Sequence, residues 1–159
     1  MSIRILIVCL GNICRSPTAE AVLAGRIAAR GLSQSIEVDS AGTAAYHVGN
    51  PPDPRSQAAA ANRYYDLSSL RARQLNVQDF ENFDYILAAD NQNLADILAL
   101  QKQAISEGVE NRAIVNLFLE PLNETITQVP DPYYGGDNGF EEVLDLCEKA
   151  SDLWLDKLT

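Results

Sequence analysis

The sequence lacks a long apolar run, an excess of positive charge and internal repeats, and each absence excludes a class of protein. No stretch approaches the roughly 20 apolar residues that span a bilayer, and the start shows no signal-peptide pattern. Twelve Lys and Arg stand against 22 Asp and Glu, and the resulting net charge of −10 would repel a nucleic acid backbone. We therefore expect neither membrane insertion nor a nucleic acid partner.

Cysteine and histidine are also scarce. Three cysteines do not make a disulfide framework, and the one histidine, His47, has no recognisable partners for a metal site. We place His47 in a surface loop and expect no metal, no cofactor and a reducing, cytoplasmic compartment. The 159 residues suffice for one domain with its own core, and we expect residues 1–159 to form it. No feature of the sequence indicates an oligomeric state.

Apolar runs typical of buried strands alternate along the chain with segments of helical period. The strand-like runs are residues 3–8, 36–39, 84–88 and 113–117. The helix-like segments are residues 17–30, 54–64, 77–82, 91–103 and 139–157, with Gly31 as the C-cap of the first. This alternation predicts an α/β fold with a four-stranded parallel sheet, flanked by helices on both faces in a flavodoxin-like arrangement.

The segment between the first strand and the first helix carries the most informative residues. It reads Cys9-Leu10-Gly11-Asn12-Ile13-Cys14-Arg15-Ser16-Pro17. Pro17 fits the first turn of a helix, and a helix N-terminus attracts anions through its unpaired N–H groups. Gly11 and Asn12 suit backbone positions with positive φ, which a tight anion-binding loop requires. We expect the amides from Leu10 to Arg15 to turn inward around an anion.

These residue types match the chemistry of phosphate ester cleavage. The Arg15 guanidinium can hold two phosphate oxygens, and Cys9 would lie beneath a ring of donors whose field favours its thiolate. Ser16 can donate a hydrogen bond to the sulfur. A buried structural cysteine would explain Cys9 alone and leave the rest of the loop unexplained. A nucleotide-binding P-loop is excluded because the pattern G-x-x-x-x-G-K-[ST] is absent.

The loop also carries a resemblance to a known family, together with three further segments in the expected order. These are Ser40-Ala41-Gly42-Thr43, Phe83-Asp84-Tyr85-Ile86 and Val129-Pro130-Asp131-Pro132-Tyr133-Tyr134-Gly135. Along essentially its whole length, the chain resembles low-molecular-weight protein tyrosine phosphatases. The resemblance implies the phosphotyrosine phosphatase I-like fold and hydrolysis of phosphotyrosine and other aryl phosphates. It also implies phosphotyrosine proteins as substrates, a cysteinyl-phosphate intermediate, and phosphate or a similar oxyanion in the loop.

Roles for individual residues follow from the same resemblance. Cys9 would be the nucleophile, Arg15 would hold the phosphate, and Asp131 would act first as general acid and then as general base. The phosphate would be bound by Leu10, Gly11, Asn12, Ile13, Cys14 and Ser16. Tyr46 and Tyr133, or its neighbour Tyr134, would form aromatic walls that favour phosphotyrosine over phosphoserine. From composition alone, Pro130-Asp131-Pro132 is typical of a turn in which the Asp131 side chain binds the backbone.

One position departs from the family pattern. Many members have a histidine where Leu70 stands, and there it supports the phosphate loop through the asparagine that matches Asn12. Ser40 matches another member of that supporting network. The departure leaves the rigidity of the loop and the acidity of Cys9 open, but it does not affect the nucleophile, the arginine or the acid.

Several alternatives stay open from the sequence. Cys14 is either a small apolar loop residue or a redox partner that traps oxidised Cys9 as a disulfide, while Cys147 is typical of a core residue. An arsenate reductase would need a relay of further cysteines, and a phosphate-binding protein without catalysis would not need Asp131. In related bacterial phosphatases, arginine specificity accompanies Thr where Ile13 stands, so Ile13 favours phosphotyrosine over phosphoarginine or small phosphate esters.

Overall fold

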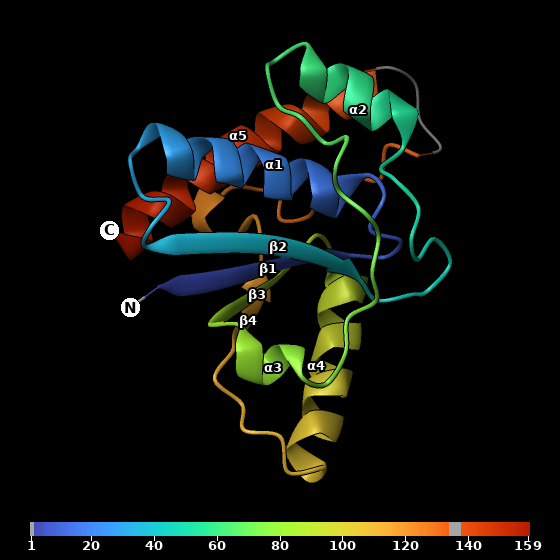
Figure 1. The fold of residues 1–159 in the computed structure, drawn as a ribbon, viewed down its shortest axis with the longest axis vertical. Helices are drawn as coiled ribbons and strands as arrows, with labels where there is room; N and C mark the ends of the chain where they lie inside the picture. Colours follow the sequence, from blue (N-terminus) through green and yellow to red (C-terminus); the bar gives the residue numbers. More distant parts are fainter. Residues whose placement is uncertain (1, 134–137) are drawn as a thin grey trace.

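A parallel sheet between two helical layers organises the structure, a computed structural model that describes residues 2–133 and 138–159 (Figure 1). Its strands are β1 (Ile3–Cys9), β2 (Ile36–Gly42), β3 (Tyr85–Ala88) and β4 (Ile114–Leu117). They lie in the order β2-β1-β3-β4, and each neighbouring pair is parallel. The predicted α/β fold with a four-stranded parallel sheet is therefore confirmed.

Helices cover both faces of this sheet. They are α1 (Arg15–Ala29), α2 (Pro54–Ala61), α3 (Asp79–Asn82), α4 (Asn91–Ser106) and α5 (Asn138–Leu158), with a 3₁₀ turn, η1 (Glu120–Leu122). Helices α1 and α5 pack on one face, and α3 and α4 lie on the other (Figure 1). Within the described ranges, no helix combines the length and apolar character needed to cross a membrane.

The strand β1 contributes to both layers because its alternate side chains point to opposite faces. Ile5 and Ile7 belong to the core cluster that includes residues of α1 and α5. Leu6 and Val8 belong to the second cluster, with residues of α3 and α4. This central strand is paired on both sides and buried from Ile5 to Cys9, so the predicted nucleophile lies at the end of the innermost strand of the sheet.

The predicted helices and strands are confirmed, although several of their ends differ. β2 continues to Gly42 because its backbone pairs with β1 as far as Cys9. α1 begins at Arg15, which leaves Pro17 in its first turn. Gly31 has φ +70° and its N–H donates to the carbonyl of Ala28, as expected of a residue that ends a helix. The turn η1 was not predicted, because three residues are too few to show a period.

The sheet topology fixes where a ligand can bind. In an open parallel sheet, the connections leave in opposite directions from two neighbouring strands, and the crevice at their carboxyl ends is free for a ligand. Here those neighbours are β1 and β3, since β2 lies on one side of β1 and β3 on the other. The segment from Cys9 to Arg15 joins β1 to α1 at this crevice.

We predict that Gly42→Ala distorts this segment. A Cβ at Gly42 would lie 2.7 Å from the carbonyl oxygen of Leu10, so the loop backbone would have to move. Overpacking against backbone should lower the free energy of unfolding by about 2 kcal/mol, measured by urea denaturation.

Gly108→Ala is the matched control for that experiment. Gly108 has φ +87° and open space around it, so alanine should cost only the left-handed backbone penalty of about 1 kcal/mol and leave the loop undisturbed. If the structure of the Gly42→Ala variant showed an unmoved loop, the close approach of β2 to Leu10 would not constrain the site.

Candidate active site

The backbone of the loop from Cys9 to Arg15 turns its amides inward. Four of its carbonyls are bonded to neighbouring segments: Cys9 to the Thr43 N–H, Leu10 to the Ala44 N–H, Ile13 to the Asp53 N–H, and Cys14 to Thr18. A trans peptide directs its N–H opposite to its C=O, so the N–H groups that follow these carbonyls point to the inside of the loop. The Asn12 N–H lies 3.3 Å from Cys9 Sγ. The loop is therefore a cradle of N–H dipoles around the sulfur.

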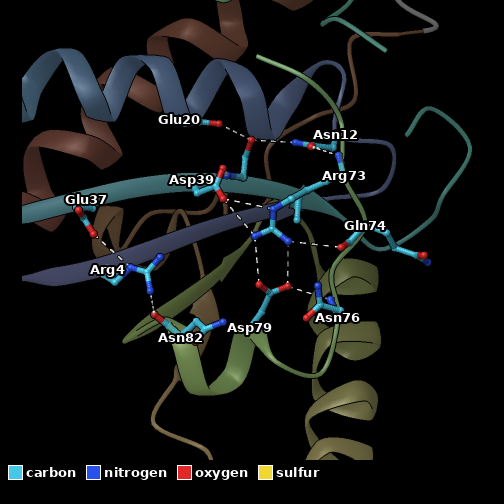
Figure 2. Close-up of polar contacts among 12 residues, drawn as sticks. Arg4, Asn12, Glu20, Glu37, Asp39, Arg73, Gln74, Asn76, Asp79 and Asn82 are labelled. Carbon is cyan, nitrogen blue, oxygen red and sulfur yellow. Dashed lines mark hydrogen bonds and ion pairs between the residues drawn. The ribbon is translucent and has the colours of Figure 1, made fainter. Parts of the chain in front are cut away.

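Asn12 holds the shape of this cradle. It has φ +57°, the left-handed region that asparagine tolerates better than most residues. Its side-chain amide is fully used: Nδ2 donates to Ser16 Oγ at 2.7 Å and to Ser40 Oγ at 2.9 Å. Its Oδ1 accepts the backbone N–H of Arg73 at 3.0 Å (Figure 2). These contacts tie the loop to α1, β2 and the segment before α3.

Gly11 corrects one sequence prediction. Its φ is not positive, so the positive φ expected at both Gly11 and Asn12 is found at Asn12 alone. Glycine is favoured here because the His47 ring packs close to the Gly11 backbone: a Cβ at Gly11 would lie 3.0 Å from Cδ2 of His47.

Ser16 is oriented toward the predicted nucleophile. Its Oγ lies 3.0 Å from Cys9 Sγ and 3.5 Å from the carbonyl oxygen of Ala41. Because Ser16 Oγ accepts a hydrogen bond from Asn12, its own proton is left for one of these two acceptors, and the sulfur is the nearer. A hydroxyl donor and a backbone N–H thus converge on Cys9 Sγ.

The Arg15 side chain is only 6% exposed and is fixed by partners from distant segments. Its Nη1 donates to Asp90 Oδ2 at 2.7 Å and to the carbonyl of Val129 at 3.1 Å. Burial lowers the pKa of Arg15, but the Cys9 sulfur and Asp90 outweigh burial and raise it overall. Arg15 is therefore a permanent cation whose second nitrogen, Nη2, faces the cavity.

Asp131 lies across the cavity from the loop. Its Oδ2 is 4.0 Å from Arg15 Nη2, too long for a hydrogen bond, while its Oδ1 accepts the N–H of Tyr133 at 3.0 Å. One carboxyl oxygen thus forms the turn that composition favoured, and the other is directed at the site. The two interpretations of the Pro130-Asp131-Pro132 segment are compatible.

The cavity above the cradle has a volume of about 380 Å³. Its lining residues are Cys9, Leu10, Gly11, Ile13, Cys14, Arg15, Tyr46, His47, Asp131 and Tyr133. Tyr46 and Tyr133 line it as expected of aromatic walls, whereas Tyr134 lies outside the described residues. Asn12 and Ser16 do not line the cavity but support it from behind. The sequence interpretation missed His47, which is half-buried at the cavity and not simply in a surface loop.

A sequence model of the family described as low molecular weight phosphotyrosine protein phosphatase matches residues 4–159. The chain belongs to this family. Over 147 residues it is 46% identical to a Synechocystis protein described as a low molecular weight protein-tyrosine-phosphatase, covering 92% of this chain and 90% of the relative.

Solved structures agree with this family assignment. A protein tyrosine phosphatase of Entamoeba histolytica with Hepes in its active site superimposes with a TM-score of 0.87 at 39% identity, over 99% of this chain and 97% of that chain. A Drosophila arginine phosphatase gives a TM-score of 0.88 at 32% identity, over 98% and 97%. The predicted resemblance is confirmed.

An ion pair that the sequence did not reveal connects the two sides of this phosphatase site. Arg55 donates to both carboxyl oxygens of Asp53 at 3.0 and 3.1 Å, and to the carbonyl of Tyr133 at 3.1 Å. The Asp53 N–H in turn binds the carbonyl of Ile13 in the cradle. Arg55 also stacks over the rings of Tyr133 and Phe140. The loop with Asp131 is thereby anchored to the cradle.

The remaining cysteines differ from Cys9 in their surroundings. Burial raises the pKa of the Cys14 thiol to about 12, so Cys14 stays a neutral thiol in this structure. A redox role for Cys14 stays a hypothesis. Cys147 is completely buried in the core, which confirms that prediction and leaves it out of reach as a relay cysteine. Among residues 2–133 and 138–159, no three His, Cys, Asp or Glu side chains are grouped to hold a metal ion.

Asp90 is a further residue that the sequence interpretation missed, and it generates a prediction. Its Oδ1 caps α4 through the Asn93 N–H at 2.7 Å, while its Oδ2 holds Arg15. Asp90→Ala should lower the free energy of unfolding by about 3 kcal/mol, because it leaves a buried guanidinium without its carboxylate. It should also lower kcat/KM about tenfold because Arg15 is no longer fixed.

Asp90→Asn is the matched variant. It keeps one oxygen for the Asn93 N–H and therefore the cap of α4, but the amide nitrogen that then faces Arg15 cannot accept a hydrogen bond, so kcat/KM should fall as in Asp90→Ala while only the stability due to the cap is retained. Steady-state kinetics and urea denaturation of both variants make the comparison. Unchanged kcat/KM in Asp90→Ala would contradict a role of Asp90 in orienting Arg15.

Proposed function

We propose that this phosphatase hydrolyses phosphotyrosine in two displacements through a cysteinyl-phosphate intermediate. The observation that carries the proposal is the convergence of inward amides, the Ser16 hydroxyl and the Asn12 N–H on Cys9 Sγ, with Arg15 and Asp131 at the same cavity. Donors fixed around one sulfur favour its thiolate and a bound oxyanion alike. Each step of this scheme uses only side chains and backbone amides of the protein.

In the first displacement, the Cys9 thiolate attacks phosphorus while the bond from phosphorus to the tyrosine oxygen breaks. Asp131, protonated, gives its proton to the departing phenolate oxygen. Arg15 Nη2 and the loop amides hold the three non-bridging oxygens, on which charge is spread. The Ser16 hydroxyl stabilises the sulfur as nucleophile and, later, as leaving group.

In the second displacement, water attacks phosphorus and the bond from sulfur to phosphorus breaks. Asp131, now a carboxylate, takes a proton from that water, which releases inorganic phosphate and restores both the thiolate and the protonated acid. Binding of phosphate or a similar oxyanion in the loop follows from the same donors. The Entamoeba relative, which holds the sulfonate buffer Hepes in its active site, supports this part of the proposal.

The cavity walls support selectivity for an aryl phosphate. Tyr46 and Tyr133 line the cavity with the apolar side chains of Leu10 and Ile13, so a flat phenyl ring can be buried above the cradle. A short phosphoserine side chain would leave these walls uncovered. The Drosophila arginine phosphatase makes phosphoarginine the second candidate substrate, and Ile13, in place of the smaller polar Thr, favours tyrosine.

Two further parts of the proposal concern the protein as a whole. We infer that residues 1–159 act as one phosphatase domain, since the family match extends over residues 4–159 and both helical layers share β1. We also infer a cytoplasmic location, because a reactive Cys9 thiolate with Cys14 close by in sequence would oxidise outside a reducing compartment.

The hydrolysis of phosphotyrosine, phosphoserine and phosphoarginine peptides, measured with a metal chelator, tests the proposed activity. We expect chelator-resistant turnover with phosphotyrosine preferred by at least about tenfold. Cys9→Ser should abolish turnover and keep oxyanion binding, because the cradle remains while the nucleophile is lost. Turnover retained by Cys9→Ser would exclude the cysteinyl phosphate, and preference for phosphoarginine would select the second candidate substrate.

The role of Asp131 predicts a dependence on the leaving group. Asp131→Asn should lower kcat/KM, which reports the first displacement alone, about 100-fold for a poor leaving group such as phenol. The loss should be much smaller for an acidic nitrophenol, which departs without a proton. Glu124→Gln, on an exposed carboxyl elsewhere, is the control. An equal loss for both esters would contradict general acid catalysis by Asp131.

A further inference from the structure

Glu20 is a half-buried carboxyl that the proposed mechanism does not use. It lies on α1 one turn beyond Ser16, on the side of the helix that faces β2. Its Oε1 accepts a hydrogen bond from Ser40 Oγ at 2.6 Å (Figure 2). A carboxyl placed against the supports of the phosphate cradle requires an explanation, because burial of an ionisable group is costly.

A line of hydrogen bonds connects Glu20 to the nucleophile. Ser40 Oγ donates to Glu20 and accepts from Asn12 Nδ2 at 2.9 Å. Asn12 Nδ2 also donates to Ser16 Oγ, which lies 3.0 Å from Cys9 Sγ. Each hydroxyl in the line thus accepts one hydrogen bond and donates the next, so the orientation of one member fixes that of its neighbour.

The direction of these bonds is determined by the Asn12 amide. Because Asn12 Oδ1 accepts the Arg73 N–H, its two amide hydrogens must go to Ser16 and Ser40. Ser40 must therefore present a lone pair to Asn12 and send its proton to Glu20. An ionised carboxylate accepts that proton more strongly than a neutral acid does, and the shared hydrogen bonds are strengthened in turn.

We propose that Glu20 is a positioning residue for Cys9. When the Glu20 carboxylate is ionised, it orders the phosphate cradle through Ser40 and Asn12. The inference rests on the proposed role of Cys9 as nucleophile. It assigns to Glu20 the support that the family histidine provides in other members, because Leu70 at that position packs against the core and has no polar group.

The surroundings of Glu20 bring its ionisation into the neutral range. Burial raises the pKa of Glu20 to about 7, and the charge of Asp39 on β2 raises it as well. The Ser40 hydrogen bond and the charge of Arg73 lower it in part. Arg73 is itself held between Asp39 and Asp79, at 3.3 and 3.2 Å, so its charge is shared with two other carboxylates (Figure 2).

Ionisation of Glu20 has opposite effects on stability and on the cradle. The folded protein binds the Glu20 proton up to about pH 7, whereas the ordinary value is 4.5. Between these values the folded state holds more protons than the unfolded state, so the Glu20 contribution to stability is complete at low pH and is lost as the pH rises through about 7. The cradle gains order over the same range. A purely structural carboxyl would produce only the first effect.

The ratio of kcat/KM in the wild type to that in Glu20→Gln tests this inference, because the titration of the substrate is common to both enzymes and cancels in the ratio. We expect a ratio near one at about pH 5.5 and near ten at about pH 8, with a midpoint close to the Glu20 transition. The free energy of unfolding of Glu20→Gln, relative to wild type, should rise over the same range.

Glu37→Gln is the matched control, since Glu37 is an exposed carboxyl of β2 whose partner is Arg4. Its ratio should stay near one at every pH. In a Ser40→Ala background, Glu20→Gln should have no further pH-dependent effect, because the line to Asn12 is already cut. A ratio for Glu20→Gln that does not vary with pH would overturn the inference.

A measurement on the wild type keeps the inference testable even if Glu20→Gln does not fold. The Asn12 side-chain amide resonances should show a transition near pH 7 in the absence of phosphate, and should keep it in His47→Gln, which removes the one imidazole. Absence of that transition would overturn the inference. If the wild type shows the transition but does not hydrolyse phosphotyrosine, the result would instead contradict the proposed function.

Discussion

The three hydrogen bonds of the Asn12 side-chain amide hold the active site together. A left-handed residue in the middle of a loop costs about 1 kcal/mol, and such a conformation persists only where its surroundings determine it. Here the amide is bonded at once to α1, to β2 and to the segment at Arg73. The inward direction of the loop amides, and with it the environment of Cys9, follows from that fixed point.

Local dipoles, and not the overall charge, make this an anion site. A protein with a net charge of −10 repels a phosphate ester at long range. Inside the cavity the balance is reversed, since fixed N–H groups and the buried Arg15 guanidinium act at hydrogen-bond distance. Asp90 and Asp131 bring negative charge to the same guanidinium, but Asp90 binds the nitrogen turned away from the cavity, Nη1, and Nη2 remains for the ligand.

Most of the fold and the cradle could be predicted from the sequence because they depend on local patterns. Apolar runs gave the strands, and the spacing from Cys9 to Arg15 gave the loop. The positive φ predicted for Asn12 is confirmed, whereas the positive φ predicted for Gly11 is wrong. Glycine is required at position 11 by the close approach of His47, which is a tertiary contact. The roles of Asp90 and the Asp53–Arg55 ion pair were missed for the same reason. A helix cap and an ion pair between residues two apart have ordinary local sequences, and only the folded chain brings them to the cradle.

The partners of Arg15 have a consequence for how the enzyme is made. Arg15 is bonded to the carbonyl of Val129, and the face of the sheet behind Cys9 is covered by α5. During synthesis, a nascent chain that has emerged only as far as β4 contains the whole sequence of the cradle but neither of these elements. Such long-range contacts form late, after the local ones. The proposed nucleophile is therefore translated early, whereas the contacts around it are complete only after the last helix has been made.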